Sequence, residues 1–167
     1  MFGVGLLMII VLMGVTGSGK TTVGRLLAGD LGWAYLDADD FHSEQNIRKM
    51  KSGTPLNDDD RRPWLESLRE TIQDYLSRNE NAVLACSALR ESYREFLLLD
   101  ERVKFVYLKG DYRMIQERLA ERRGHYMDPA LLDSQFETLE EPTESLRIDA
   151  SSDPAAIVSI IRNELSI

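Results

Sequence analysis

Residues 14–21, GVTGSGKT, are the feature that most limits how this chain can fold. They fit G-x-x-x-x-G-K-[ST], the phosphate-binding P-loop, whose glycines let backbone N–H groups turn inward around phosphate oxygens. The pattern is informative where a strand precedes it and a helix follows it. Here the apolar run MIIVLM (8–13) precedes it and a helical pattern over 20–31 follows it. The motif therefore predicts a nucleotide phosphate site; the alternative is a glycine-rich turn without a ligand.

The P-loop motif predicts the roles of individual side chains. We expect Lys20 to reach the β- and γ-phosphates and the hydroxyl of Thr21 to ligate Mg²⁺. The amino end of the following helix adds a partial positive charge. The residues expected to hold the nucleotide are Gly14, Thr16, Gly17, Ser18, Gly19, Lys20, Thr21 and Thr22.

The remainder of the chain alternates apolar strand patterns with helical patterns. Strands are expected at 8–13, 34–38, 82–86, 103–109 and 146–149, and helices at about 20–31, 43–51, 60–78, 88–99, 111–123, 129–139 and 154–165. Apolar strands separated by helices indicate a parallel sheet covered on both faces. We therefore expect one α/β domain over residues 1–167. It is a three-layer α/β/α P-loop NTPase fold with a five-stranded parallel sheet and a short helical lid at about 122–138.

Composition narrows the function classes. The net charge of −8 and the lack of a long basic run argue against a general nucleic-acid binder. The first 15 residues are apolar and contain no Lys or Arg, whereas a signal peptide begins with basic residues. The apolar stretch is also shorter than the roughly 20 residues that a membrane-spanning helix needs. We expect a buried first strand there, with Met8 as an alternative start. The single cysteine, Cys86, is expected to be a core residue in a reducing, cytoplasmic compartment.

The segment DADDFH (37–42) concentrates carboxylates at the end of the second expected strand. The strand next to the first one ends close to the phosphates in a P-loop protein. Asp37 and Asp39 would point to the same side if the extended geometry persists. The strand 82–86 is followed by no acid, so these two residues are expected to supply the site's carboxylates, with Asp37 nearer the metal. The alternative is an acidic loop that merely caps the next helix, a role that we assign to Asp40.

Several blocks of the sequence together resemble the gluconate kinases of the short P-loop type. They are GVTGSGKTT, LDADDFH, NIRKM, PLNDDDRRPWL, ACSALRESYR, FVYLKG and RGHYM…LLDSQFETLEEP, between about residue 10 and residue 142. The resemblance implies transfer of phosphate from ATP, with Mg²⁺, to the terminal hydroxyl of D-gluconate, giving 6-phospho-D-gluconate. It also implies a homodimer whose other partners are small molecules, with no nucleic acid and no membrane.

The resemblance also implies roles on the acceptor side. Asp39 would accept or orient the proton of the substrate hydroxyl, and His42 would bond another hydroxyl; the alternative for His42 is a packed or capping imidazole. A guanidinium is the natural partner of the gluconate carboxylate, and three arginines remain open for it. They are Arg48, Arg61 and Arg94, with a surface salt bridge as the alternative for each. Further expected substrate contacts are Ser87, Arg90, His125 and Gln135.

The helical pattern that starts at Asp111 carries Arg118 and Arg122 on one face, four residues apart. In related small kinases one such arginine packs over adenine and the next reaches the phosphates. We therefore expect Arg118 to bind the nucleotide and Arg122 to act in catalysis. The alternative is a solvated basic face.

Competing functions are another small-molecule kinase, for shikimate or a nucleotide, and a regulatory GTP-binding switch. Shikimate kinases carry a glycine triplet where this chain has Cys86, Ser87 and Ala88. The guanine-reading pattern N-K-x-D is only mimicked by LKGD (108–111), which has leucine in the first place. A non-catalytic nucleotide-binding module would be favoured if Lys20 or the paired aspartates were missing, and they are present.

Overall fold

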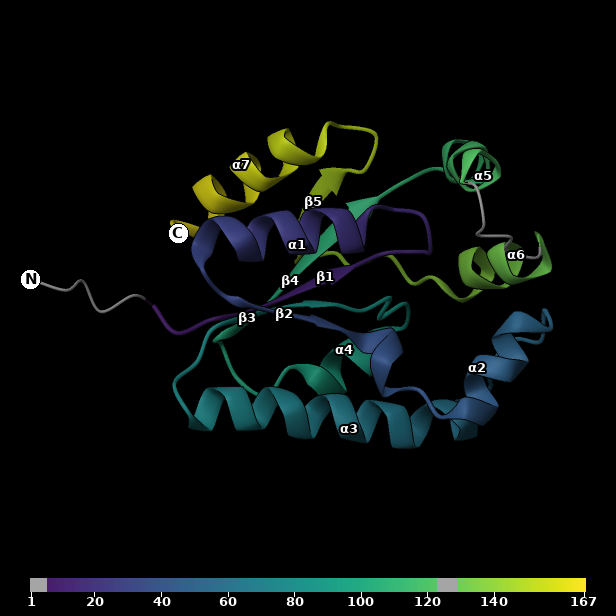
Figure 1. Ribbon diagram of the computed structural model, residues 1–167, viewed down its shortest axis with the longest axis horizontal. Coiled ribbons are helices and arrows are strands. Elements are labelled where there is room, and N and C mark those ends of the chain that lie inside the picture. Colours follow the sequence, from purple (N-terminus) through teal and green to yellow (C-terminus); the bar gives the residue numbers. More distant parts are fainter. Residues whose placement is uncertain (1–5, 123–128) are drawn as a thin grey trace, which may run out of the picture.

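The computed structural model describes residues 6–122 and 129–167 (Figure 1). Strands and helices alternate along most of the chain, as the sequence predicted. The strands are β1 (Ile9–Met13), β2 (Ala34–Asp37), β3 (Ala82–Ala85), β4 (Val103–Lys109) and β5 (Leu146–Asp149). The helices are α1 (Lys20–Leu31), the 3₁₀ helix η1 (Ala38–Phe41), α2 (Glu44–Lys51), α3 (Asp58–Ser77), α4 (Glu91–Leu97), α5 (Tyr112–Glu121), α6 (Pro129–Thr138) and α7 (Pro154–Leu165).

The five strands form one parallel sheet in the order β2-β3-β1-β4-β5. β1 lies at the centre and pairs with β3 on one side and β4 on the other, with Leu12 opposite Ala85 and Val106. The strand order reverses at β1, and ligands of open α/β sheets bind at the carboxyl ends of the strands at such a point. The sheet confirms the predicted fold and places the P-loop at this position.

The two faces of β1 belong to two different cores. Ile9, Val11 and Met13 pack with α3 and α4, whereas Ile10 and Leu12 pack with α1 and α7. Figure 1 shows the same division, with α1 and α7 on one side of the sheet and α3 and α4 on the other. All five residues of β1 are buried. A continuous apolar strand is therefore required, because both faces are covered.

Some helix boundaries differ from the sequence prediction. α3 begins at Asp58, two residues earlier than expected, because Asn57 and Asp60 form a capping box. α4 is shorter than predicted at both ends. Ala88 has a positive φ of 44° and Arg90 is extended, so the chain cannot be helical before Glu91.

Local contacts define the start of α7 and the environment of Cys86. The carboxylate of Asp153 accepts the N–H of Ala155 at the start of α7, with Pro154 next to it. Cys86 is buried, and burial raises the pKa of its thiol to about 12, as expected for an inert core residue. In residues 6–122 and 129–167 no helix is long and apolar enough to cross a membrane.

The packing of α3 yields a stability prediction. Leu68 is fully buried in the core between α3 and the sheet. Leu68→Ala is expected to lower the free energy of unfolding by about 3 kcal/mol, because it removes buried methyl groups and leaves a cavity. Urea denaturation followed by circular dichroism measures this. Glu70→Ala, at an exposed position of the same helix, should change it by less than about 0.5 kcal/mol.

Candidate active site

The P-loop connects the carboxyl end of β1 with the amino end of α1. Gly14 has a φ of 147°, and a Cβ there would lie 2.7 Å from the carbonyl oxygen of Leu108, so only glycine fits. Gly19 precedes α1 in the left-handed region, with a φ of 100°. Ser18 is buried, and within the described residues its Oγ is the one buried side-chain atom without a hydrogen-bond partner. These features fit a loop that is shaped to receive further polar atoms.

Lys20 folds back over the loop that carries it. Its Nζ donates to the carbonyl oxygens of Gly14 and Val15, both at 2.9 Å. Burial lowers the pKa of Lys20 to about 8, while the nearby charge of Asp39 favours the protonated form. The loop therefore holds an ammonium group that is poorly hydrated and has an acidic neighbour.

The acidic segment turns sooner than the sequence suggested. β2 ends at Asp37, and the next four residues form η1, so the extended geometry expected to align Asp37 with Asp39 does not persist. The carboxylate of Asp37 caps this turn by accepting the N–H of Asp39 at 3.0 Å. Asp39 stays accessible to solvent, yet partial loss of hydration and then the charge of Asp37 raise its pKa. Both carboxylates act on Lys20, so the turn brings them to the P-loop by a different route.

Asp40 does not have the capping role that the sequence assigned to it. The N-cap of α2 is Ser43, whose Oγ accepts the N–H of Asn46 at 3.2 Å. Asp40 is exposed, and the cap of η1 is Asp37. Serine is a favoured N-cap because its short side chain reaches the free amides of the first turn.

The two expected magnesium ligands lie near one hydroxyl group. Tyr35 donates to Oδ2 of Asp37 at 3.3 Å, and the side chain of Thr21 lies close enough to the same phenol to favour its ionised form. Within residues 6–122 and 129–167, no group of three or more His, Cys, Asp or Glu side chains could hold a metal by itself. One hydroxyl and one carboxylate fit Mg²⁺, which keeps several waters and shares its ligands with substrate phosphates.

The wall opposite the P-loop is formed by η1 and the first turns of α3. Nε1 of Trp64 donates to the carbonyl oxygen of Ala38 at 2.7 Å, which fixes α3 to the acidic turn. The imidazole of His42 stacks on Trp64 with 4.4 Å between ring centroids and 8° between planes. Burial and then the positive charge of Arg61 lower the pKa of His42 to about 4, so the imidazole is neutral at pH 7. A neutral imidazole offers one donor and one acceptor.

The structure separates the three arginines expected at the acceptor end. Arg61 lies at the wall, where it affects His42, and Nη1 contacts the hydroxyl of Tyr93 at 3.2 Å. That hydroxyl in turn donates to Asp58 at 2.6 Å, and Arg90 lies 3.8 Å from the other oxygen of Asp58. Arg48, in contrast, has a side chain that is 77% exposed and pairs with Glu44 one turn earlier on α2.

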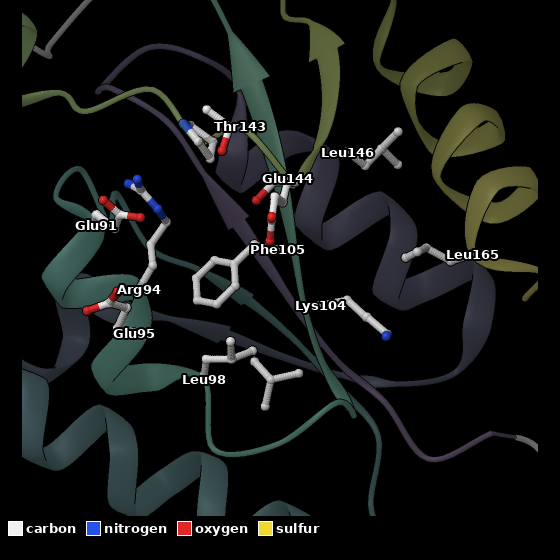
Figure 2. A pocket seen from close by; sticks show the side chains of 13 residues that line it. Glu91, Arg94, Glu95, Leu98, Lys104, Phe105, Thr143, Glu144, Leu146 and Leu165 are labelled. Atoms are coloured by element: carbon white, nitrogen blue, oxygen red, sulfur yellow. The ribbon is translucent and has the colours of Figure 1, made fainter.

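Arg94 requires a correction. It is buried and donates to three main-chain carbonyls, those of Ala88, Leu89 and Glu140, at 2.8–3.1 Å. It also lines a pocket of about 550 Å³ that extends to Val103 at the amino end of β4, the edge opposite the P-loop. Figure 2 shows the guanidinium of Arg94 next to Glu91, and Glu95 and Phe105 also line this pocket. Its guanidinium fixes the loops around α4, so we do not retain it as a substrate arginine.

The expected nucleotide arginines lie beside the P-loop. Arg118 donates to the carbonyl oxygens of Gly17 and Ala150, at 3.3 and 2.5 Å. A hollow of about 260 Å³ joins the loop to the start of α7 and is lined by Ser18, Gly19, Thr22, Val23, Arg118, Arg122, Ala150, Ser152, Pro154 and Ile157. Arg122 is exposed at the end of α5, and its charge reaches Lys20. His125 falls outside the described residues.

The two remaining expected substrate contacts are attached to the P-loop itself. Ser87 accepts the N–H of Gly14 with its main-chain carbonyl at 3.2 Å. The side-chain carbonyl of Gln135 accepts the N–H of Thr16 at 2.7 Å. Sequence reasoning missed this contact, as it missed Tyr35, Asp58 and Tyr93. The partner of Gln135 lies 119 positions away and those of Asp58 and Tyr93 lie 35 positions apart, so no local pattern could have revealed them. Tyr35 is only two residues from Asp37, a local spacing that could have indicated their contact.

Comparison with known proteins places this geometry in a family. The shikimate kinase family model matches residues 16–163. A probable gluconokinase of Xenopus tropicalis is 46% identical over 177 residues, covering 95% of this chain and 93% of that protein. The thermoresistant gluconokinase of Escherichia coli (strain K12) is 43% identical, covering 90% and 89% of the two chains. The crystal structure of a gluconokinase from Sinorhizobium meliloti 1021 has a TM-score of 0.84 and 37% identity, covering 96% and 97%.

Similarity at this level extends along nearly the whole chain. The chain therefore belongs to the gluconokinase family, within the wider shikimate kinase family of P-loop kinases.

Proposed function

We propose that this protein transfers the γ-phosphoryl group of ATP to the terminal hydroxyl of D-gluconate, giving 6-phospho-D-gluconate and ADP. The observation that carries the proposal is that the acidic turn joins the P-loop to a wall of polar side chains. Lys20 and Asp39 lie at the P-loop, and His42 and Arg61 lie on the wall that Trp64 fixes to the acidic turn. The relatives named gluconokinase support this choice of substrate.

On the nucleotide side, the chain supplies charge and orientation. The amides from Gly17 to Thr21 and the ammonium of Lys20 would hold the phosphates, and Arg118 would border the adenine along the hollow toward Pro154. Arg122, at the mouth of that hollow, would add positive charge to the transferring group. Thr21 and Asp37 would hold Mg²⁺, which when bound would neutralise charge on the phosphate oxygens.

On the acceptor side, Asp39 takes the proton of the substrate hydroxyl. The hydroxyl oxygen forms a bond to the γ-phosphorus while the bond from that phosphorus to the β–γ bridging oxygen breaks, and ADP leaves with the electron pair. The raised pKa of Asp39 suits this role, because a stronger base accepts a proton more readily. The neutral His42 would bond a hydroxyl of the chain. Arg61 is our first candidate for the carboxylate, with Arg90 beside it across Asp58 and Tyr93.

The choice of substrate gives the central test. Release of ADP is followed in a coupled assay with gluconate, glucose, shikimate and nucleoside monophosphates. Gluconate should be preferred over glucose by about a thousandfold in kcat/KM, because glucose would leave a recognition arginine unpaired. Equal use of glucose and gluconate would contradict the proposed function, and preference for shikimate would replace it.

The acidic turn gives a second prediction. Asp39→Asn should reduce kcat by a factor of 10² or more, since general-base catalysis contributes on the order of 10²–10⁴, while ATP binding changes little. Asp40→Asn is the matched control, because Asp40 is exposed and caps no helix. The measurements are kcat and the affinity for ATP of the two variants. Equal effects of the two substitutions would show that Asp39 is not the base.

The arginine at the wall gives a third prediction. Arg61→Ala should raise the KM for gluconate at least tenfold and leave the KM for ATP unchanged, because a charge-assisted bond to a carboxylate is worth about 1.5–3 kcal/mol. Arg62→Ala is the control. Its side chain is 70% exposed and pairs with Asp59 on the same helix. If Arg62→Ala and Arg61→Ala have the same KM for gluconate, Arg61 does not bind the carboxylate.

A further inference from the structure

A third apolar cluster joins the P-loop to the helices that follow β4. Val15 of the loop, Leu89 after β3, Ile115 of α5 and Leu132 of α6 are all buried against one another. The contact with α5 is close, because a Cβ on Gly17 would lie 3.3 Å from Ile115. In Figure 1, α5 and α6 lie beyond the amino end of α1, on the side of the P-loop. The loop is thus packed against α6 as well as its own helix.

One polar contact runs along this apolar cluster. Oε1 of Gln135, on α6, accepts the N–H of Thr16 at 2.7 Å. Thr16 is the third residue of the P-loop, and amides of this loop form the phosphate-binding nest. Both residues are half-buried, so water competes for the bond less than it would at an exposed site. The direction of one P-loop amide is therefore set by a side chain 119 residues away.

α6 is held firmly enough for this contact to be specific. The hydroxyl of Tyr112, on α5, donates to Asp133 of α6 at 2.6 Å, and the ring of Tyr112 lies 5.3 Å from that of Phe136. The N–H of Glu140, just after α6, donates to the carbonyl oxygen of Leu89 at 2.8 Å. With the helix fixed at its middle and at its carboxyl end, the reach of Gln135 to Thr16 is defined by the fold.

We propose that Gln135 is a positioning residue that holds the first half of the P-loop in its phosphate-binding shape and couples nucleotide binding to α6. Gln135 acts by orienting the N–H of Thr16 in the loop that binds the nucleotide phosphates. This differs from the direct substrate contact that the sequence suggested for Gln135. The proposal rests on the proposed function for the identity of the two ligands.

The test compares Gln135→Met with Glu137→Met. Methionine matches the length of glutamine but cannot accept the Thr16 N–H, and Glu137 is an exposed position on the same helix. Gln135→Met should weaken ADP binding, measured by calorimetry, about tenfold, because it leaves a partly buried donor unpaired. The KM for gluconate should stay within about twofold of the wild-type value. Glu137→Met should behave as the wild type in both measurements.

Hydrogen exchange provides a second readout that is independent of turnover. ADP binding should slow amide exchange in α6 of the wild type and of Glu137→Met, and the slowing should be lost in Gln135→Met. If Gln135→Met does not fold, Gln135→Glu replaces it. Glutamate keeps an acceptor oxygen at the same distance from Thr16 but adds a negative charge. If residue 135 lies on the nucleotide side, this charge repels the phosphates of ADP, so the affinity for ADP should fall more than the affinity for gluconate.

A raised KM for gluconate with unchanged ADP affinity would overturn the proposal and restore a direct substrate contact. Wild-type ADP affinity and unchanged protection of α6 in Gln135→Met would also overturn it. Calorimetry and exchange require only ADP, so they remain decisive for Gln135 even if the wild-type protein fails to phosphorylate gluconate, an outcome that would contradict the proposed function alone.

Discussion

The pairing of β1 with both β3 and β4 is the constraint on which the rest of the structure depends. A strand buried on both faces and bonded on both edges has no freedom to shift, so its carboxyl end is a fixed point. The chain leaves that point through Gly14, where neighbouring main chain and Ser18 leave no room for a side chain. The amino end of α1 and the ends of β2 and β3 then meet around the loop. A rigid strand thus determines where a phosphate can bind.

Burying charged groups at this point costs free energy, and the cost is visible as pKa shifts of both Lys20 and Asp39. Lys20 is poorly hydrated and has a lowered pKa, while Asp39 has a raised pKa beside Asp37. These shifts have opposite signs and bring the two groups closer in proton affinity. A ligand with phosphate charge would stabilise the positive charge on Lys20. The same geometry that destabilises the free site therefore favours an anionic nucleotide.

The acceptor wall is held by a different kind of interaction. The indole ring of Trp64 stacks on His42, and its Nε1 donates to the carbonyl oxygen of Ala38. One side chain therefore joins α3, η1 and the imidazole. Asn57 caps the same helix and sets the turn on which Arg61 stands. Polar recognition at this wall depends on apolar packing beneath it. In the proposed function, a loss of α3 stability would therefore also weaken selection of the substrate.

The sequence by itself determined the sheet, the P-loop and the order of the elements, because apolar periodicity and glycine patterns act over a few neighbouring residues. It also determined the family, since the blocks from the P-loop to LLDSQFETLEEP are specific. Only the tertiary structure decided which of several similar side chains face the site. Arg94 carries the same guanidinium as Arg61 yet is bonded to main-chain carbonyls, Asp40 caps nothing, and Gln135 reaches Thr16. Those outcomes depend on partners distant in sequence, and hydrogen-bond geometry between distant segments exists only once the chain has folded.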